Sequence, residues 1–375
     1  MLRLGYDAKR LFHNFTGLGN YSRSLLHDLQ RYFPEHEYHL YCPRPSQDPR
    51  TTSFQRQPPW RVHHSGRQPA AYWRSYGVKR DLREAGIQLF HGLSHEIPRG
   101  LRRHGIRSVV TIHDLIFKQH PELFPYVDRQ IYEWKFGHAC RQADRVVAIS
   151  ESTKADIIRW YGTPADQITV VYQTCHDRFQ APIPDAQIAA VRQRYSLPKR
   201  YLLSVGALIE RKNLLGLLEA WEQLPADLRL PVVVVGEGAA YRRRIEAQLA
   251  AMGRSREVLF LGRASAADLP ALYHEAELLV YPSLYEGFGI PLIEALFCGT
   301  PVLTSSRSSL PEAAGPGAHY VDPRDTESMR AGLEKVLQDS SYRTELRRAG
   351  GAYVQRFRGR QIAEEMMAVY QEVMA

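Results

Sequence analysis

The sequence has no long hydrophobic run. None of its apolar stretches approaches the roughly 20 residues of a membrane-spanning helix, and the first of them, MLRLGYDAKRLF, already contains charged residues. We therefore expect a soluble, unprocessed protein. No tract of interleaved arginine and aromatic residues is longer than residues 67–80, and no nucleic-acid-binding module is recognisable, so we expect no nucleic-acid partner.

Cysteine is scarce. The four residues, Cys42, Cys140, Cys175 and Cys298, show no C-x-x-C spacing, which favours reduced structural thiols in a cytoplasmic enzyme over a disulfide framework or a zinc site. His91 and His95 are four residues apart, but no third ligand is near them and Gly92 weakens any helix that would align them. We therefore expect no metal site.

The chain is long enough for two cores. Its 375 residues, 44% of them hydrophobic, suit two α/β domains. The formal charge of +9 comes mostly from arginine and favours acidic partners such as phosphates or the anionic face of a membrane.

Short apolar runs alternate with amphipathic helical stretches in both halves of the chain, which is typical of parallel βαβ units. In the first half, the expected strands are near residue 4 and at 38–41, 88–91, 108–114, 145–150 and 168–172. In the second half, they are at 201–206, 231–236, 258–262, 278–283 and 301–305. Ligands of such doubly wound sheets bind at the carboxyl ends of strands.

A proline-containing segment at 177–187 has little apolar periodicity and is interpreted as a linker. We therefore expect one Rossmann-like domain at 1–185 and another at 186–358. The last stretch, 359–375, is an amphipathic helix whose stripe consists of Ile362, Met366, Val369 and Val373. Core packing explains this stripe; binding of a partner by its methionines is the alternative.

The segment YPSLYEGFGIPLIEALFCGTPVLTS (281–305) carries the strongest signal. A strand ends near Ser283, a glycine-rich loop follows, and Pro291 stands where a first helical turn begins. The helix dipole and the loop N–H groups suit a diphosphate. The N–H donors are those of Gly287, Phe288, Gly289 and Ile290.

Two carboxylates, Glu286 and Glu294, flank this loop. A carboxylate accepts two hydroxyl hydrogen bonds at once, as the diol of a sugar or a ribose requires. The alternative is that Glu294 complements the helix N-terminus and Glu286 is solvated.

A second turn, in SVGALIERKNLLGLLEAW (204–221), places Arg211 and Lys212 after a strand. Two cations at a strand's carboxyl end can neutralise a departing diphosphate, although a solvated turn would also contain such a pair.

Two weaker signals lie in the first half. Gly17 and Gly19 occupy a glycine-rich turn before a helix, where they either border a ligand or only permit the turn. His113 and Asp114 directly follow a strand; His113 is a candidate catalytic group, with a structural hydrogen-bonding role as the alternative, and Asp114 is the weaker candidate.

Together, these segments resemble the retaining two-domain (GT-B) glycosyltransferases of family 4, whose E-x7-E signature stands here in the frame PS-x-x-EGFGIP-x-x-EA. The resemblance implies two Rossmann-like domains facing each other across a cleft, an N-terminal acceptor-binding domain, and a last helix that crosses back onto that domain. It implies that Glu286 faces the donor sugar and that Glu294 binds the ribose.

The resemblance also assigns roles to the weaker signals. In the family's G-x5-K spacing, kept here from Gly206 to Lys212, Arg211 and Lys212 bind pyrophosphate. Gly17 and Gly19 would approach the donor phosphates and the acceptor, and His113 would contact the donor sugar near the reaction centre. The chain lacks a D-x-D element, so no metal and no cofactor are expected.

The stretch HDLIFKQHPELFP is similar to bacterial mannosyl- and D-rhamnosyltransferases of O-antigen and surface polysaccharide synthesis, which use GDP-sugars. This resemblance implies a nucleotide-sugar donor, front-face retaining transfer, and a polyprenyl-diphosphate-linked glycan acceptor at the inner membrane. Arginines with Trp73, Tyr76 and Trp160 would suit a peripheral membrane contact; a solvated basic surface is the alternative. The competing functions are a UDP-glucose or UDP-N-acetylglucosamine transferase, a sugar-nucleotide epimerase, and a scaffold with an inactive donor site.

Overall fold

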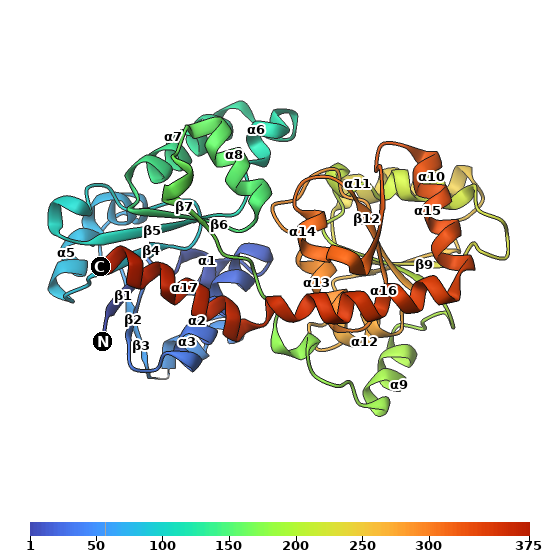
Figure 1. Cartoon of the computed structure of the whole chain (residues 1–375), viewed down its shortest axis with the longest axis horizontal. Coiled ribbons are helices and arrows are strands. Elements are labelled where there is room, and N and C mark those ends of the chain that lie inside the picture. Colours follow the sequence, from blue (N-terminus) through green and yellow to red (C-terminus); the bar gives the residue numbers. More distant parts are fainter. Residues whose placement is uncertain (57) are drawn as a thin grey trace. The chain divides into compact units, whose positions relative to one another are not determined.

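The chain forms two compact units in the computed structural model, which describes residues 1–56 and 58–375. Unit 1 comprises Met1–Thr174 and Phe357–Ala375, and unit 2 comprises Cys175–Arg356 (Figure 1). Each unit contains one parallel sheet with helices packed on it, so the predicted α/β class with two doubly wound sheets is confirmed.

The sheet of unit 1 has seven strands. In spatial order they are β3 (Trp60–His63), β2 (Glu37–Tyr41), β1 (Arg3–Asp7), β4 (Leu89–Gly92), β5 (Arg107–Ile112), β6 (Arg145–Ala148) and β7 (Ile168–Val170). The helices before β4 are α1 (Lys9–His13), α2 (Gly17–Tyr32), α3 (Ser53–Arg56), α4 (Ala70–Tyr72), the π-helical turn η2 (Trp73–Gly77) and α5 (Val78–Glu84). The helices after β5 are α6 (Ile116–Gln119), α7 (Tyr126–Gln142), α8 (Glu151–Tyr161) and α17 (Gly359–Met374).

The sheet of unit 2 has six strands. In spatial order they are β10 (Val258–Gly262), β9 (Val232–Val235), β8 (Leu202–Val205), β11 (Leu278–Tyr281), β12 (Val302–Ser305) and β13 (Ala318–Val321). Its helices are α9 (Asp185–Arg194), α10 (Leu214–Glu222), α11 (Ala239–Ala251), α12 (Leu269–His274), α13 (Ile290–Phe297), α14 (Leu310–Ala314), α15 (Thr326–Gln338) and α16 (Ser340–Tyr353).

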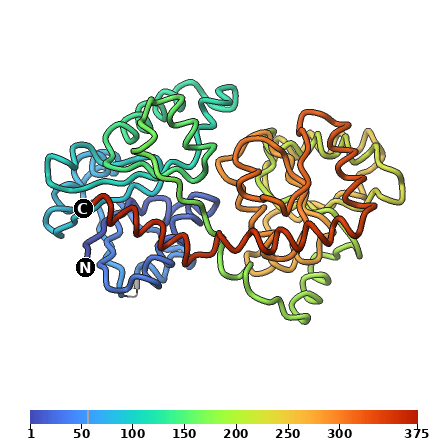
Figure 2. Tube along the Cα trace, in the orientation of Figure 1, coloured from blue at the N-terminus to red at the C-terminus, as the bar shows by residue number. Residues whose placement is uncertain are grey.

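The C-terminal helix α17 is part of unit 1. It lies beside α2, and Ile362, Met366 and Val369 of the predicted stripe are buried in the same core as Leu25 and Leu29 of α2. The end of the chain thus runs next to the segment that follows β1, as the Cα trace shows (Figure 2). The stripe belongs to a hydrophobic core, which is the plain interpretation of its spacing.

Two edge strands, β3 and β13, were not expected from the sequence. Both are short, and their Trp-Arg-Val-His and Ala-His-Tyr-Val runs place polar residues in every second or third position. An edge strand is paired on one side only, so it tolerates polar residues. Its sequence then lacks the continuous apolar run by which an interior strand is recognised.

The division between the units falls before the predicted linker. Phe179 is buried against the ring of Tyr273, with centroids 5.9 Å apart, which ties residues after Thr174 to unit 2. The segment 177–187 also contains the first residues of α9. At the other end, Phe357 packs on Tyr172, with ring centroids 5.5 Å apart, and joins unit 1.

Candidate active site

The strand order of unit 2 reverses between β8 and β11. From β8 the chain continues to β9 on one side, and from β11 it continues to β12 on the other. At such a point the loops at the carboxyl ends of the two strands turn apart and leave a crevice for a ligand. The two loops that follow these strands contain Arg211, Lys212 and Glu286.

These three side chains form one buried cluster. The Glu286 carboxylate lies 2.6 Å from Lys212 Nζ through Oε1 and 2.8 Å from Arg211 Nη1 through Oε2. Tyr281 at the end of β11 adds a hydroxyl, which accepts from Lys212 Nζ and donates to Glu286 Oε1 at 3.2 Å. The Leu284 N–H donates to the Arg211 carbonyl at 2.9 Å, so the two loops are also joined through their backbones.

The cluster is ionised and carries one net positive charge. Burial acts to raise the pKa of Glu286, but the adjacent Lys212 and Arg211 outweigh it and hold this pKa at about 2. Burial lowers the pKa of Lys212, against the attraction of Glu286. Glu286 therefore fixes two cations in place without cancelling both, which leaves a preorganised site for an anion.

Glycines let the backbones come close beside this cluster. Gly206 has φ +147°, a backbone conformation that favours glycine, and a Cβ there would make an ordinary contact with Lys212 Cε at 3.4 Å. Gly236, which follows β9, has φ +154°, and its Cβ would lie 1.7 Å from the Gly206 carbonyl oxygen. Gly236 was not singled out from the sequence, although the G-E-G run after a strand is a recognisable signal.

The loop before α13 is held by two serines. Ser308 Oγ accepts from the Glu286 N–H at 3.0 Å, and Ser309 Oγ donates to the carbonyls of Glu286 and Phe288, each at 2.9 Å. Ser308 adopts φ +53°, an uncommon backbone state for a residue with a side chain. The sequence pattern did not point to either serine, because they lie more than 20 residues from Glu286.

The helix N-terminus is built as predicted from the glycine-rich loop. Gly289 is the N-cap residue with φ +121°, and α13 begins at Ile290 with Pro291 in its first turn. Phe288 is buried and anchors the loop, next to Gly287. The backbone of this segment therefore enters the helix near Glu286, where the helix dipole favours negative charge.

The second glutamate of the signature has a different environment. Glu294 lies in the second turn of α13 and accepts a hydrogen bond from the Tyr273 hydroxyl at 2.7 Å. Burial raises its pKa to about 7, although the Tyr273 hydrogen bond and the charge of Arg178 act to lower it. Glu286 and Glu294 thus have pKa values on opposite sides of the ordinary glutamate value.

Two of the predicted site glycines begin α2 in unit 1, and their surroundings differ. A Cβ on Gly19 would lie 1.6 Å from the Asn14 carbonyl oxygen, whereas no heavy atom lies within 4 Å of a Cβ on Gly17. Asn14 Oδ1 accepts from the N–H groups of Thr16 at 2.9 Å and Gly19 at 3.1 Å, so it caps the helix. Gly19 is required by packing, while Gly17 faces open space.

His113 lies in unit 1, whereas the other predicted catalytic residues lie in unit 2. Its Nε2 contacts the Leu93 carbonyl at 2.9 Å, so it donates there, and its Nδ1 contacts Gln173 Nε2 at 3.2 Å and accepts. Burial lowers its pKa to about 4, and the Tyr21 ring packs on it edge to face with centroids 4.6 Å apart. His113 is therefore a neutral, oriented imidazole. Asp114 accepts from the Ile116 N–H at 3.1 Å.

His91 and His95 have separate structural partners. His91 contacts Tyr370 through Nδ1 and Thr111 through Nε2, and His95 stacks on Phe136 with centroids 4.2 Å apart. In residues 1–56 and 58–375, no group of three or more His, Cys, Asp or Glu side chains is arranged to hold a metal ion.

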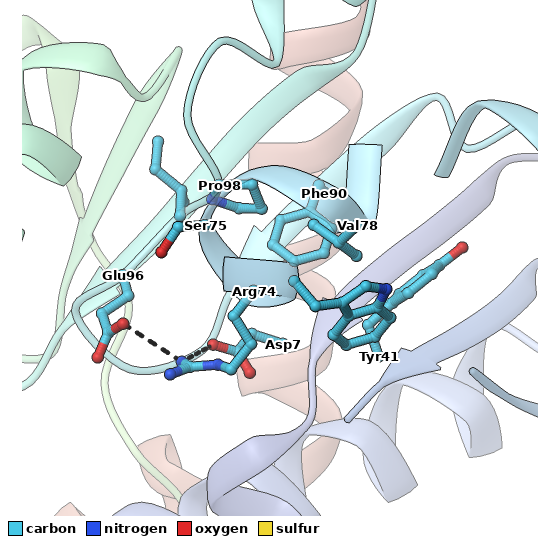
Figure 3. A pocket seen from close by; sticks show the side chains of 10 residues that line it. Asp7, Tyr41, Arg74, Ser75, Val78, Phe90, Glu96 and Pro98 are labelled. Carbon is cyan, nitrogen blue, oxygen red and sulfur yellow. Dashed lines mark hydrogen bonds and ion pairs between the residues drawn. The ribbon is translucent and has the colours of Figure 1, made fainter. Parts of the chain in front are cut away.

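Unit 1 contains a small charged pocket at its own point of strand reversal. β1 leads to β2 on one side and β4 leads to β5 on the other, and Asp7 ends β1 while Glu96 follows β4. Arg74 Nη2 lies 2.5 Å from Asp7 and 3.4 Å from Glu96 (Figure 3). Its Nε is buried and has no hydrogen-bond partner in the described chain. The cavity measures about 20 Å³ and accommodates a group the size of a water molecule.

One predicted surface residue is not at the surface. Trp73 is 1% exposed, and its Nε1 donates to Asp81 at 2.6 Å, so the prediction that it contacts a membrane is wrong. A tryptophan whose indole N–H has a buried acceptor packs inward. Tyr76 and Trp160 are exposed, as that prediction requires. None of the described helices is long and apolar enough to cross a membrane.

Comparison with known proteins gives matches over both units. The family described as Glycosyltransferase Family 4 matches residues 15–176, and the family described as Glycosyl transferases group 1 matches residues 189–352. The chain is 35% identical to O-antigen chain mannosyltransferase B of Escherichia coli over 70% of this chain and 68% of the relative. It is 33% identical to the serotype-specific mannosyltransferase WbdA of E. coli over 64% of this chain and 30% of that longer protein.

A solved structure with the same fold is Anabaena HepE in complex with UDP. It matches with a TM-score of 0.78 and 19% identity, over 99% of this chain and 100% of the HepE chain.

Proposed function

We propose a donor, an acceptor and a stereochemical course for this protein from one premise: the chain belongs to glycosyltransferase family 4 and is a hexosyltransferase. The proposed reaction is retaining transfer of mannose, or of the related D-rhamnose, from its GDP-sugar onto a growing lipid-linked glycan. The mannose assignment is supported by the O-antigen mannosyltransferase relative, with which this chain shares 35% identity.

The single observation that carries the proposal is the ionised cluster of Arg211, Lys212 and Glu286 at the β8–β11 reversal. A nucleoside diphosphate is an anion, and its negative charge grows as the bond to the sugar breaks. Two cations that are already held in position stabilise that charge with little reorganisation. No divalent ion is required in this scheme.

In the proposed transfer, the bond between the anomeric carbon and the diphosphate oxygen breaks as the diphosphate leaves toward Arg211 and Lys212. The acceptor oxygen bonds to the same face of that carbon, and its proton passes to an oxygen of the departing diphosphate. Glu286 orients the two cations beside the donor sugar. His113 of unit 1 is proposed separately, as a neutral imidazole that contacts a sugar hydroxyl. The anomeric configuration is retained, which NMR of the product would test directly.

The nucleoside is assigned to the second carboxylate. Glu294 is close enough to Tyr273 to be oriented by its hydroxyl, and one carboxylate oxygen accepts that bond while the other remains for a ribose hydroxyl. The loop residues Gly287–Gly289 and Ile290, the first residue of α13, supply N–H groups for the diphosphate, and the helix adds its positive dipole end.

The acceptor is assigned to unit 1. The pocket of Asp7, Arg74 and Glu96 has room for a group the size of a water molecule, such as one sugar hydroxyl, beside the carboxylates of Asp7 and Glu96. We propose that the glycan carrier is a polyprenyl diphosphate, and that the enzyme works in the cytoplasm against the inner face of the membrane. The O-antigen chain function named for the E. coli relative supports this acceptor class.

The main rival is a UDP-glucose or UDP-N-acetylglucosamine transferase, and a sugar-nucleotide epimerase is the more distant one. Calorimetric and thermal-shift titrations with GDP, UDP and ADP, followed by their sugars, separate these functions because the stabilisation of the folded protein increases with the affinity of the ligand at a given concentration. We expect GDP to bind most tightly. A preference for UDP would overturn the mannose assignment, and turnover of the sugar nucleotide to an isomer without any acceptor would indicate the epimerase.

A further inference from the structure

Large hydrophobic side chains are exposed mainly in one part of unit 1. In the described chain, eleven such side chains are exposed, and nine of them lie between Tyr72 and Trp160. Three large aromatic residues are especially open: Tyr72 is 57% exposed, Tyr76 42% and Trp134 50%. A concentrated set of exposed aromatic residues indicates a surface that binds something.

Four residues from three segments form one continuous row. The rings of Tyr72 and Tyr76 lie 5.9 Å apart, and the Arg99 guanidinium lies 5.9 Å from the Tyr76 ring and 4.2 Å from the Trp134 ring. We call Tyr72, Tyr76, Arg99 and Trp134 the aromatic row. Arg99 joins α4 and the following π-helical turn to α7 through contacts with aromatic faces.

The outer face of α7 continues the row. Val127, Ile131 and Trp134 are spaced by four and three residues, so they share one side of the helix, and Val127 and Ile131 are 66% and 44% exposed. The opposite side of α7 buries Phe136 and Cys140 in the core. α7 therefore has one apolar side in the core and a second apolar side that is exposed.

Cations without acidic partners accompany these side chains. Within residues 1–56 and 58–375, Lys79, Arg99 and Arg129 form no ion pair. Lys79 Nζ lies 5.9 Å from the Tyr76 ring, and the Arg129 guanidinium lies 5.4 Å from the Tyr126 ring. Aromatic residues mixed with unpaired cations match the chemistry of an anionic bilayer surface, where aromatic rings lie at the headgroup level and lysine or arginine meets lipid phosphate.

The row also adjoins the acceptor pocket. Ser75 and Pro98 line that pocket, and the next residues in the chain, Tyr76 and Arg99, belong to the row. The Arg99 N–H donates to the Ser75 carbonyl at 2.9 Å, which fixes the two segments together at the pocket margin. A surface that lies on a bilayer here would hold the pocket beside the headgroups, where a lipid-linked glycan is presented.

We propose that the aromatic row and the outer face of α7 dock unit 1 onto a bilayer containing anionic phospholipid. The proposal deepens the proposed function, because it gives the lipid-linked acceptor a place of approach, but docking itself requires no donor or acceptor. Membrane docking and catalysis can therefore fail separately.

The test uses the full-length protein and vesicles of phosphatidylcholine alone or with about one third phosphatidylglycerol. We expect flotation with the anionic vesicles, at least about tenfold weaker binding to the neutral ones, and a blue shift of tryptophan fluorescence on binding. The double variant Tyr76→Ser/Trp134→Ser should lose at least about tenfold of the binding and most of the blue shift. Both residues are exposed, so the variant should fold.

Two matched controls separate this surface from general charge and hydrophobicity. Arg99→Glu should weaken binding to anionic vesicles more than Arg256→Glu, which makes the same charge change at an exposed position of unit 2. Trp160→Ser removes an exposed tryptophan of α8 and should leave binding near the wild-type level.

Calorimetry with GDP should show the same affinity in all these variants. If the wild-type protein does not bind GDP, that result contradicts the donor assignment and leaves the docking surface unaffected. Equal vesicle binding by the double variant, or no preference of the wild type for anionic vesicles, would overturn the proposal. A wild-type dimer that the double variant breaks would also overturn it, because the face would then bind a second copy of the chain.

Discussion

The hydroxyl of Tyr370 lies 2.7 Å from Nδ1 of His91, although the two residues are 279 positions apart in the chain. The contact joins α17 to the end of β4, and it continues from His91 Nε2 to the Thr111 hydroxyl at 2.8 Å and on to Tyr21 at 3.0 Å. Tyr21 in turn packs on His113. The last helix of the chain is thus connected by buried polar contacts to the surroundings of a predicted site residue.

Tyr370→Phe should destabilise unit 1. It leaves a buried imidazole nitrogen without its partner, so we expect the free energy of unfolding to fall by about 2 kcal/mol. Tyr126→Phe, which removes a hydroxyl from an exposed side chain, should change it by less than about 0.5 kcal/mol. Urea unfolding followed by circular dichroism measures both; equal stability of the two variants would show that the contact contributes nothing.

Glu286→Ala and Lys212→Ala should each lower turnover at least about a hundredfold. Lys212→Ala removes a cation that would stabilise the leaving diphosphate, and Glu286→Ala removes the carboxylate that orients both cations. Steady-state transfer rates with saturating donor provide the measurement. Glu210→Gln is the matched control, since Glu210 is an exposed acid beside the same two cations and pairs with Arg244. A near-normal rate for either cluster variant, with an intact fold, would remove the role assigned to that residue.

Glu294 should make donor binding depend on pH near neutrality. Its pKa is about 7, and the ionised carboxylate is the better acceptor for ribose hydroxyls. The affinity for GDP-mannose should therefore rise from pH 6 to pH 8, which lie about one unit below and above this pKa. The diphosphate of GDP-mannose does not titrate in this range. Calorimetric titrations of wild type and Glu294→Gln provide the comparison; a profile that is equally steep in the variant would assign the dependence to another group.

Ionisation of the same carboxyl group should lower the stability of the fold, whereas it raises the affinity for the donor. Because its pKa in the folded chain is raised from 4.5 to about 7, the unfolded chain releases the proton first, and this contribution to stability is lost as the pH rises from 4.5 to 7. Glu286 acts in the other direction: its pKa of about 2 contributes stability above pH 4.5 that is lost as the pH falls toward 2. Glu294→Gln should therefore flatten the unfolding free energy between pH 4.5 and pH 7 relative to wild type.

Gly19→Ala and Gly17→Ala form a matched pair at the start of α2. The Cβ at residue 19 would lie 1.6 Å from a backbone carbonyl oxygen, so we expect a loss of about 3 kcal/mol or more in unfolding free energy. The Cβ at residue 17 meets no atom within 4 Å, and that variant should fold normally. If Gly17→Ala nevertheless loses transfer activity, the open face of this turn binds a substrate; unchanged activity would leave Gly17 without a role in the site.

Adding EDTA should leave the transfer rate unchanged, because the proposed charge stabilisation comes from Arg211, Lys212 and the α13 N-terminus. The rate is measured before and after dialysis against the chelator. Loss of activity that Mg²⁺ or Mn²⁺ restores would show that a cation assists the leaving group.

Local patterns in the sequence determined the two doubly wound sheets, the interior strands and the glycine-rich helix start at Gly289–Pro291. These features depend on neighbours in the chain: a buried parallel strand must be a continuous apolar run, and a tight entry into a helix needs glycine and proline at set positions. For the same reason, the motifs that contain Glu286, Glu294, Arg211 and Lys212 are recognisable from the sequence alone.

Only the tertiary structure decided how these residues are held and charged. The sheet order brings Lys212 to Glu286 across 74 positions, and it gives Glu286 and Glu294 opposite pKa shifts, although both are glutamates of one short motif. The environment of each carboxylate depends on Tyr281, Tyr273, Ser308 and Ser309, which no local pattern marks. Trp73 turned inward and Trp134 outward for the same reason: burial is set by the elements that pack around a side chain, and these come from distant parts of the chain.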